Sequence, residues 1–268
     1  MTMSGDDCAR FVGAYLDHMG DASWAERGTR ERGPGELLSA SANLLRGGDI
    51  QQVVTAAAFV GDAATGALGD KVRRSVRPRI RERVRSALTA CLWSNEYRAR
   101  DAAVRCLGRM GFARDGATVE RAFWWYLDRY PLELQPVMFE LSYLGRVRGW
   151  ARRIEAMVSH RRASVRWSTL DCIPRTHFRH YRWAELRVWR ASLESLREDS
   201  STDIAAESVW RLRLLEDGGG TAPPIDHGEA PVRTFEQVSS AFRRSLAERG
   251  LRDYSIDDFE VYAWGRAH

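Results

Sequence analysis

The sequence predicts an all-α protein whose helices stack in consecutive pairs, and three observations lead to this prediction. Glycine and proline divide the 268 residues into segments of helix length, within which apolar residues recur at the spacing of a helical stripe. No segment alternates apolar and polar residues over enough length to predict a β-strand. A short motif of Val-Arg, small residues and an apolar end recurs at the interval expected of a two-helix unit.

The clearest predicted helices lie within residues 79–216. The first, Arg79–Trp93, follows Pro78, and proline suits the first turn of a helix because it has no N–H to leave unpaired. The other helices are expected at about 98–110, 117–130, 132–145, 150–160, 164–173, 183–197 and 203–216.

The two ends of the chain depart from this pattern and are predicted to be caps. Asp6–Met19 reads as an amphipathic helix, and Gly20–Gly35 as a charged, glycine-rich loop. Asp217–Arg233 contains three consecutive glycines and Ala-Pro-Pro, which is typical of a linker. Thr234 and Gln237 form a capping-box signal for a later helix. We therefore expect a helical array at 1–216 with an N-terminal cap at 1–70, a linker at 217–233, and a C-terminal helical cap at 234–268.

Two segments carry the repeated motif most clearly. Ala99–Met110 contains Val-Arg, small residues and Leu-Gly, and Val165–Ile173 repeats this order with Pro174 in the glycine position. The anchor residues of successive units, separated by 37, 29 and 39 residues, are Leu107, Leu144, Ile173 and Leu212. This pattern resembles the second helix of a HEAT repeat. The resemblance implies a right-handed alpha-solenoid of HEAT-like helix pairs, clearest over residues 79–216, and it indicates no single function.

Composition excludes several classes of protein. Ten tryptophans and 44% hydrophobic residues are too many for a disordered chain. The longest uncharged run, at about 50–61, is too short to span a bilayer, so no membrane partner is expected. Asp6 and Asp7 stand where a secretion signal would carry basic residues, which favours a cytoplasmic location.

The residues that could bind a metal form only a sparse set. The four cysteines lie far apart without a CxxC pair, so buried free thiols are expected. Cys172, His177 and His180 could supply three ligands, but the two histidines fall in a predicted connection between helices, and we expect neither metal nor cofactor. The chain contains no glycine-rich phosphate loop, nucleophile elbow or HExxH motif.

Charge is distributed very unevenly along the chain. Residues 1–70 hold 5 basic and 10 acidic side chains, residues 71–184 hold 25 and 10, and residues 185–268 hold 11 and 16. Two clusters supply much of the positive centre. Lys71–Arg85, which we call the basic segment, has eight basic residues and one acid, and Arg146–Arg166, the second arginine cluster, has seven and one. Guanidinium groups match carboxylate and phosphate geometry, so an acidic protein or a nucleic acid is the expected partner.

In a HEAT array the second helices line the concave side, so the resemblance implies that Arg100, Arg105 and Arg166 point at a shared ligand. Arginines at such positions could bind a polyanion, and tryptophans among them could stack on bases or sugars. At least one of the adjacent Trp124 and Trp125 should be exposed, because neighbours on a helix point about 100° apart. The candidates are Arg98, Arg100, Arg105, Trp124, Trp125, Arg162, Arg166, Trp167 and Trp210.

These observations favour a non-enzymatic scaffold that holds an acidic macromolecule in an arginine-rich concave groove, with protein preferred over nucleic acid. The alternative is a DNA glycosylase. Trp124-Trp125, Asp128, Arg166 and Trp210 follow the broad order of groove residues in the HEAT-like alkylpurine DNA glycosylases, although the spacing from tryptophan to aspartate departs from that family. The resemblance implies that Asp128 would stabilise a developing sugar cation. Excision of alkylated purines therefore remains open beside binding alone.

Overall fold

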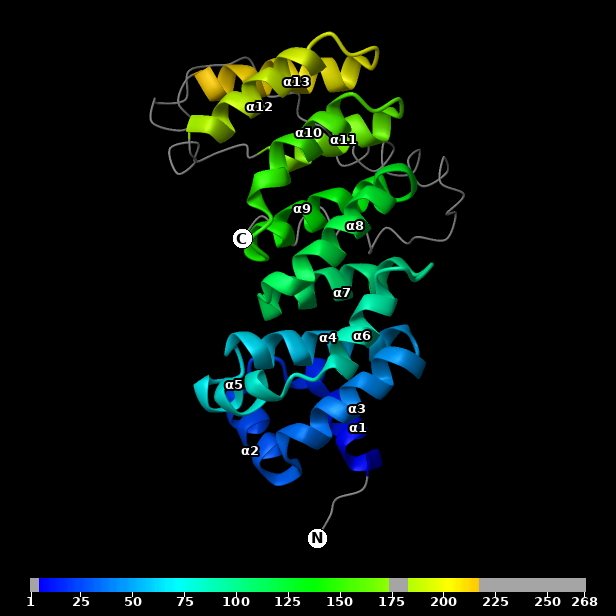
Figure 1. Cartoon of the computed structure of the whole chain (residues 1–268), viewed down its shortest axis with the longest axis vertical. Helices are drawn as coiled ribbons and strands as arrows, with labels where there is room; N and C mark the ends of the chain where they lie inside the picture. Colours follow the sequence, from blue (N-terminus) through cyan, green and yellow to red (C-terminus); the bar gives the residue numbers. More distant parts are fainter. Residues whose placement is uncertain (1–4, 174–182, 217–268) are drawn as a thin grey trace. The chain divides into compact units, whose positions relative to one another are not determined.

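The computed structural model describes residues 5–173 and 183–216, and this part of the chain is all-helical without a β-strand (Figure 1). The described residues divide into two compact units. Unit 1 comprises the residues up to Trp125 together with Pro136–Arg148. Unit 2 comprises Tyr126–Gln135 and the residues from Gly149 onward.

Unit 1 contains most of the helices. Its elements are α1 (Gly5–Gly13), η1 (Tyr15–His18), α2 (Ala22–Arg32), α3 (Pro34–Gly47), α4 (Ile50–Thr65), α5 (Asp70–Val76), η2 (Arg77–Arg79), α6 (Glu82–Cys91), α7 (Tyr97–Met110), the larger part of α8 (Ala113–Arg129) and the larger part of α9 (Leu134–Tyr143). Helix α4 contacts both α3 and α7. The core of this unit therefore forms around α4.

The sequence of α4 explains its central place. Small and apolar residues such as Ala56, Phe59 and Val60 are fully buried, so helices can pack on several of its faces. Asp49 and Gln52 close a reciprocal capping box at its start. The buried carboxylate of Asp62 accepts hydrogen bonds from the Tyr15 hydroxyl and the Arg109 guanidinium, both at 2.5 Å. These two bonds connect α4 to η1 and α7.

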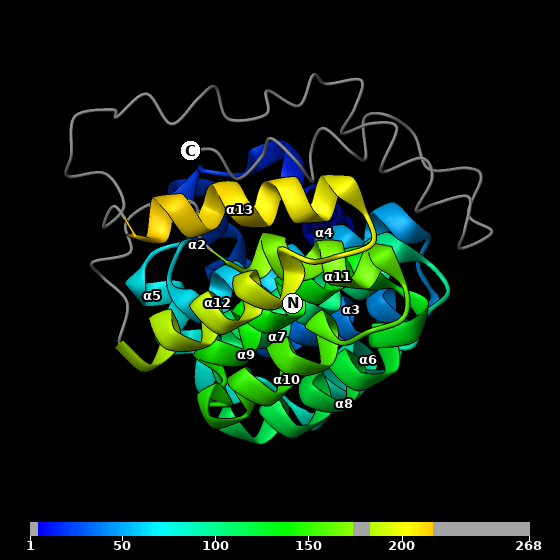
Figure 2. The ribbon, with the colours of Figure 1, turned by 90° about the horizontal axis from the view of Figure 1, so that it is seen from above.

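Unit 2 contains η3 (Pro131–Glu133), α10 (Trp150–Val158), α11 (Ala163–Cys172), α12 (Trp183–Leu196) and α13 (Thr202–Glu216). Figure 2 shows α12 and α13 side by side, in agreement with their contacts. Their apolar faces share a core with α11, made of Leu170, Ile173, Trp189, Leu193, Leu196, Ile204 and Leu212. Arg211 is buried beside this core, where it donates to Glu207 at 2.8 Å and to the carbonyl oxygen of Ile173 at 2.7 Å.

The all-α prediction is confirmed for the described residues, with shifts at some helix ends. The helix expected at Arg79–Trp93 begins at Glu82, because Arg77–Arg79 forms a separate 3₁₀ turn that includes Pro78. The helix expected at Asp6–Met19 ends at Gly13 and is followed by the 3₁₀ helix η1. The expected linker at 217–233 and the cap at 234–268 lie outside the described residues.

The prediction of a loop at Gly20–Gly35 is wrong, since this segment contains helix α2. Asp21 caps the helix by accepting a hydrogen bond from the Trp24 N–H at 3.0 Å. Gly28 lies inside the helix against the Phe11 ring, where an added Cβ would approach a ring carbon to 1.9 Å. This glycine therefore permits close packing rather than a turn, and composition alone could not distinguish the two uses.

Candidate functional site

The basic segment lies in unit 1 on α5, η2 and the first turn of α6. Its apolar residues Val72, Val76, Ile80 and Val84 are buried and recur every four residues, which fixes one side of the segment to the core. The basic residues occupy the intervening positions. Six of them are exposed to solvent, namely Lys71, Arg73, Arg74, Arg79, Arg81 and Arg83.

Most cations of the basic segment have no acidic partner. Arg73 approaches Asp70 at 3.9 Å, and buried Arg85 pairs with Asp115. Arg85 also lies 3.9 Å from Glu82, the one acid of the segment, and no other cation of the segment forms an ion pair within residues 5–173 and 183–216. The six remaining cations are Lys71, Arg74, Arg77, Arg79, Arg81 and Arg83.

Several of these six donate hydrogen bonds to neutral acceptors. Arg74 donates to the Asp70 carbonyl oxygen at 3.3 Å, and Arg79 to the Ser75 carbonyl oxygen at 2.5 Å. Arg83 donates to the side-chain oxygen of Asn43. Such bonds orient the guanidinium groups but leave their charge in place, so the segment can attract an anion.

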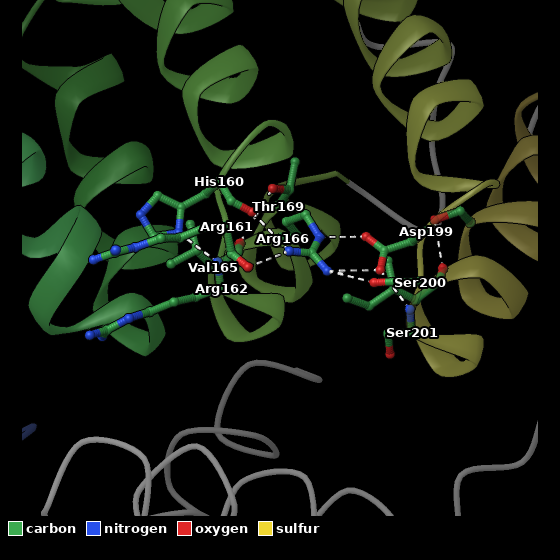
Figure 3. Close-up of polar contacts among 11 residues, drawn as sticks. His160, Arg161, Arg162, Val165, Arg166, Thr169, Asp199, Ser200 and Ser201 are labelled. Atoms are coloured by element: carbon green, nitrogen blue, oxygen red, sulfur yellow. Dashed lines mark hydrogen bonds and ion pairs between the residues drawn. The ribbon is translucent and has the colours of Figure 1, made fainter.

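The arginines of the second cluster that lie in unit 2 make a different set of contacts. Arg166 on α11 binds Asp199 through two hydrogen bonds, Nε to Oδ2 at 2.5 Å and a terminal nitrogen to Oδ1 at 3.0 Å (Figure 3). Its other terminal nitrogen donates to the carbonyl oxygens of His160 and Arg161, each at 2.9 Å. The bond from Arg166 holds the pKa of Asp199 below its usual range. Arg166 thus connects the start of α11 to the segment between α12 and α13.

Asp128 and Arg162 meet near the end of α8. The Asp128 carboxylate lies 3.0 Å from His160 Nε2, and Arg162 donates to the Asp128 carbonyl oxygen at 2.6 Å. The hydrogen bond from His160 lowers the pKa of Asp128. The Asp128 side chain is 58% exposed and that of His160 only 10%, so the carboxylate lies at the surface rather than in an enclosed site. Its catalytic role stays a prediction.

The three candidate arginines of unit 1 lie on α7 and differ in exposure. Arg98 is exposed. Arg105 is partly exposed and pairs with Asp101 at 2.7 Å. Arg100 is fully buried and donates to the Ser94 carbonyl oxygen at 2.7 Å, so it does not lie on a surface that a partner could reach in this structure.

The candidate tryptophans are all half-buried. Trp125 meets Trp93 edge to face within unit 1, and Trp124 meets Phe123 in the same way. In unit 2, Trp167 packs against the core shared by α11, α12 and α13, and Trp210 lies on α13. Partial exposure of both Trp124 and Trp125 agrees with the angular argument from the sequence. Among the candidates, Asp128 and Arg162 are in direct contact. The binding roles of all the candidates stay predictions.

The comparisons with known proteins give no assignment. No family model matches the sequence, and neither a curated protein nor a solved structure matches it. No helix in the described part of the chain is long and apolar enough to cross a membrane. Within those same residues, no group of three or more His, Cys, Asp or Glu is placed to hold a metal ion, and His177 and His180 lie outside them.

Sequence reasoning noted the basic segment but chose its candidate binding residues elsewhere in the chain. It also missed a phenylalanine, Phe112, surrounded by arginines from three elements. The contacts from Arg77 and Arg85 are pairings across the fold, to which a helical stripe gives no clue, and Arg114 lies two residues from Phe112. The only local signal is the sequence Gly111-Phe112-Ala113-Arg114 at the start of α8.

Proposed function

We propose that this chain is a HEAT-like right-handed alpha-solenoid that acts as a scaffold and binds an acidic protein through the basic segment, without catalysing a reaction. The observation that carries the proposal is that six cations of the basic segment have no carboxylate partner among the described residues. Acidic side chains of a partner would supply the missing counter-charges.

The packing of consecutive helices supports a repeat scaffold. Within unit 1, α3 contacts α4, and α6 contacts α7. Within unit 2, α10 contacts α11, and α12 contacts α13. Pairs of this kind are the building blocks of an alpha-solenoid, in which each pair needs stacked neighbours to bury its apolar face.

The surroundings of the basic segment favour an acidic protein over a nucleic acid. The basic segment spans only 15 positions. Residues 1–70 include α1 to α4 of the same unit, and they hold twice as many acidic as basic residues. A long duplex carries negative charge along its whole length and would be repelled by acidic surface beyond the segment. A short acidic stretch of a protein can place all of its negative charge against the basic segment.

The experiment is a titration of the full chain with two fluorescent probes, a polyglutamate peptide and a DNA duplex, at several salt concentrations. We expect the peptide to bind at low salt, to weaken as salt rises, and to bind more tightly than the duplex. Failure of the peptide to bind at low salt, or tighter binding of the duplex, would contradict the proposal.

A further inference from the structure

Three guanidinium groups of unit 1 surround the ring of Phe112. The central carbon of Arg85 lies 4.9 Å from the ring centroid, and those of Arg77 and Arg114 each lie 5.6 Å from it. Arg77 comes from η2, Arg85 from α6, and Arg114 from the first turn of α8. We call these four residues the Phe112 site. Each cation is attracted to the ring face, which gathers like charges that would otherwise repel one another.

Among the described residues, one of the three charges is balanced by an acidic side chain. Arg85 pairs with Asp115. Arg77 donates to the Ala64 carbonyl oxygen at 3.3 Å, a neutral acceptor, and Arg114 is exposed. Neither Arg77 nor Arg114 forms an ion pair within the described part of the chain. The Phe112 site therefore keeps two positive charges without a counter-ion.

Two further features of the site favour an anion. Arg85 is only 3% exposed, and one of its terminal nitrogens is buried without a hydrogen-bond acceptor. Helix α8 begins at Ala113, next to Phe112 in the chain, so the positive end of its dipole lies at the same place, although the Asp115 N–H of its first turn already donates to the Phe112 carbonyl oxygen at 2.8 Å. Burial, followed by repulsion from Arg114, lowers the pKa of Arg85. A bound anion would relieve that repulsion.

We infer that the Phe112 site binds a phosphate monoester carried by a phosphorylated side chain of the acidic partner. A phosphate monoester carries close to two negative charges at neutral pH, which matches the two unbalanced cations, whereas a carboxylate carries one. Its three oxygens can each accept from a guanidinium fork. This inference rests on the proposed function, because it specifies a phosphorylated residue within the protein partner.

The first test uses inorganic phosphate as the probe. Calorimetric titrations at constant ionic strength and pH 7.5 compare the unaltered chain with Arg114→Ala, Arg77→Ala and the control Arg121→Ala, which removes an exposed arginine from the same helix. We expect Arg114→Ala and Arg77→Ala each to weaken phosphate binding about tenfold, as loss of a charge-assisted contact implies. The control Arg121→Ala should change the affinity for phosphate less than twofold. Equal weakening by all three variants, or no phosphate binding to the unaltered chain, would overturn the inference.

The second test uses two acidic peptides that differ only in one phosphoserine. The phosphorylated peptide should bind about tenfold more tightly, and Arg114→Ala should remove that difference while leaving the other peptide unaffected. Equal binding of both peptides would overturn the phosphate site and leave the proposed function standing. Phosphate binding without binding of either peptide would overturn the proposed function. A DNA duplex that displaces phosphate more effectively than the phosphopeptide would place the phosphate in a nucleic acid and reject the protein source.

Discussion

The basic segment holds eight cations and one acid, and the second arginine cluster holds seven cations and one acid. In the basic segment, most charges remain without a carboxylate partner among the described residues and lie exposed around a line of buried valines and Ile80. In the part of the second cluster that belongs to unit 2, Arg166 is held by Asp199 and by two main-chain carbonyl groups, and Arg153 is buried. Similar charge density thus lies mostly at the surface in one region, whereas in the other Arg153 and Arg166 are taken into the fold and Arg152 and Arg161 remain exposed.

The two clusters differ in whether the fold brings an acidic residue from a distant part of the sequence next to an arginine. Asp199 lies 33 positions after Arg166 and reaches it only because α11, α12 and α13 share one core. Among the described residues, no such distant acid reaches the exposed face of the basic segment. A cluster of arginines therefore keeps unbalanced charge at the surface where the described fold supplies no carboxylate partner.

The largest expected effect comes from breaking the contact of Arg166 in unit 2. Asp199→Asn keeps the size of the side chain but removes its charge, and the Asp199 side chain is only 3% exposed. We expect a loss of about 2 kcal/mol in the free energy of unfolding, the scale of hydrogen bonds to charged groups. Urea unfolding measures this loss. A change below about 0.5 kcal/mol would show that the contact is no stronger than an exposed surface ion pair.

The same pair predicts an acid dependence of stability. Because the pKa of Asp199 is lowered in the folded state, its contribution is present above the unfolded-state value of about 3.9 and is lost as pH falls through the lower folded-state value. Unfolding midpoints of the unaltered chain and Asp199→Asn should therefore converge as pH falls below about 4. A constant difference between the two curves down to pH 2 would contradict this assignment of the pKa shift.

Neutralising the basic segment should have a smaller effect on stability, and of opposite sign. The triple variant Arg79→Ala, Arg81→Ala, Arg83→Ala removes three like charges that have no acidic partner in the described structure, so repulsion falls. We expect unchanged stability, or a gain of up to about 0.5 kcal/mol at low salt that disappears at high salt. Thermal unfolding at two salt concentrations measures this. A loss above about 1 kcal/mol would show that these arginines stabilise the fold.

The smallest expected effect is that of Asp128→Asn. The side chain of Asp128 is 58% exposed, and its bond to His160 is a surface contact. We expect a stability change below about 0.5 kcal/mol. A scaffold has no base-release activity to lose, so we also expect no release of alkylated bases from a damaged duplex by either protein. Base release that depends on Asp128 would establish the glycosylase alternative.

The sequence was sufficient for most helices of residues 79–216, but it missed α2 and did not reveal the contacts of the charged residues. Helical stripes placed α7 and α10 to α13 within a few residues of their ends, because apolar periodicity is a local property. The burial of Arg100 was not foreseen, since an arginine in a helical repeat reads equally well as exposed or as bonded to a nearby carbonyl such as that of Ser94. The contacts of Arg166 with Asp199, and of Phe112 with Arg77 and Arg85, join residues that are distant in the sequence, so spacing alone could not reveal them.

The measurement that tests the central claim most directly is binding of the polyglutamate peptide to two triple variants of equal charge. One is Arg79→Ala, Arg81→Ala, Arg83→Ala in the basic segment, and its control is Arg10→Ala, Arg27→Ala, Arg30→Ala, which removes three exposed arginines from the acidic part of the same unit. Three exposed charges at about 0.5 kcal/mol each correspond to roughly tenfold in affinity. We predict that the first variant binds the peptide about tenfold more weakly than the unaltered chain, and that the control binds it within about twofold. Equal loss in both variants would show that net charge alone attracts the peptide, and would contradict the basic segment as the docking surface.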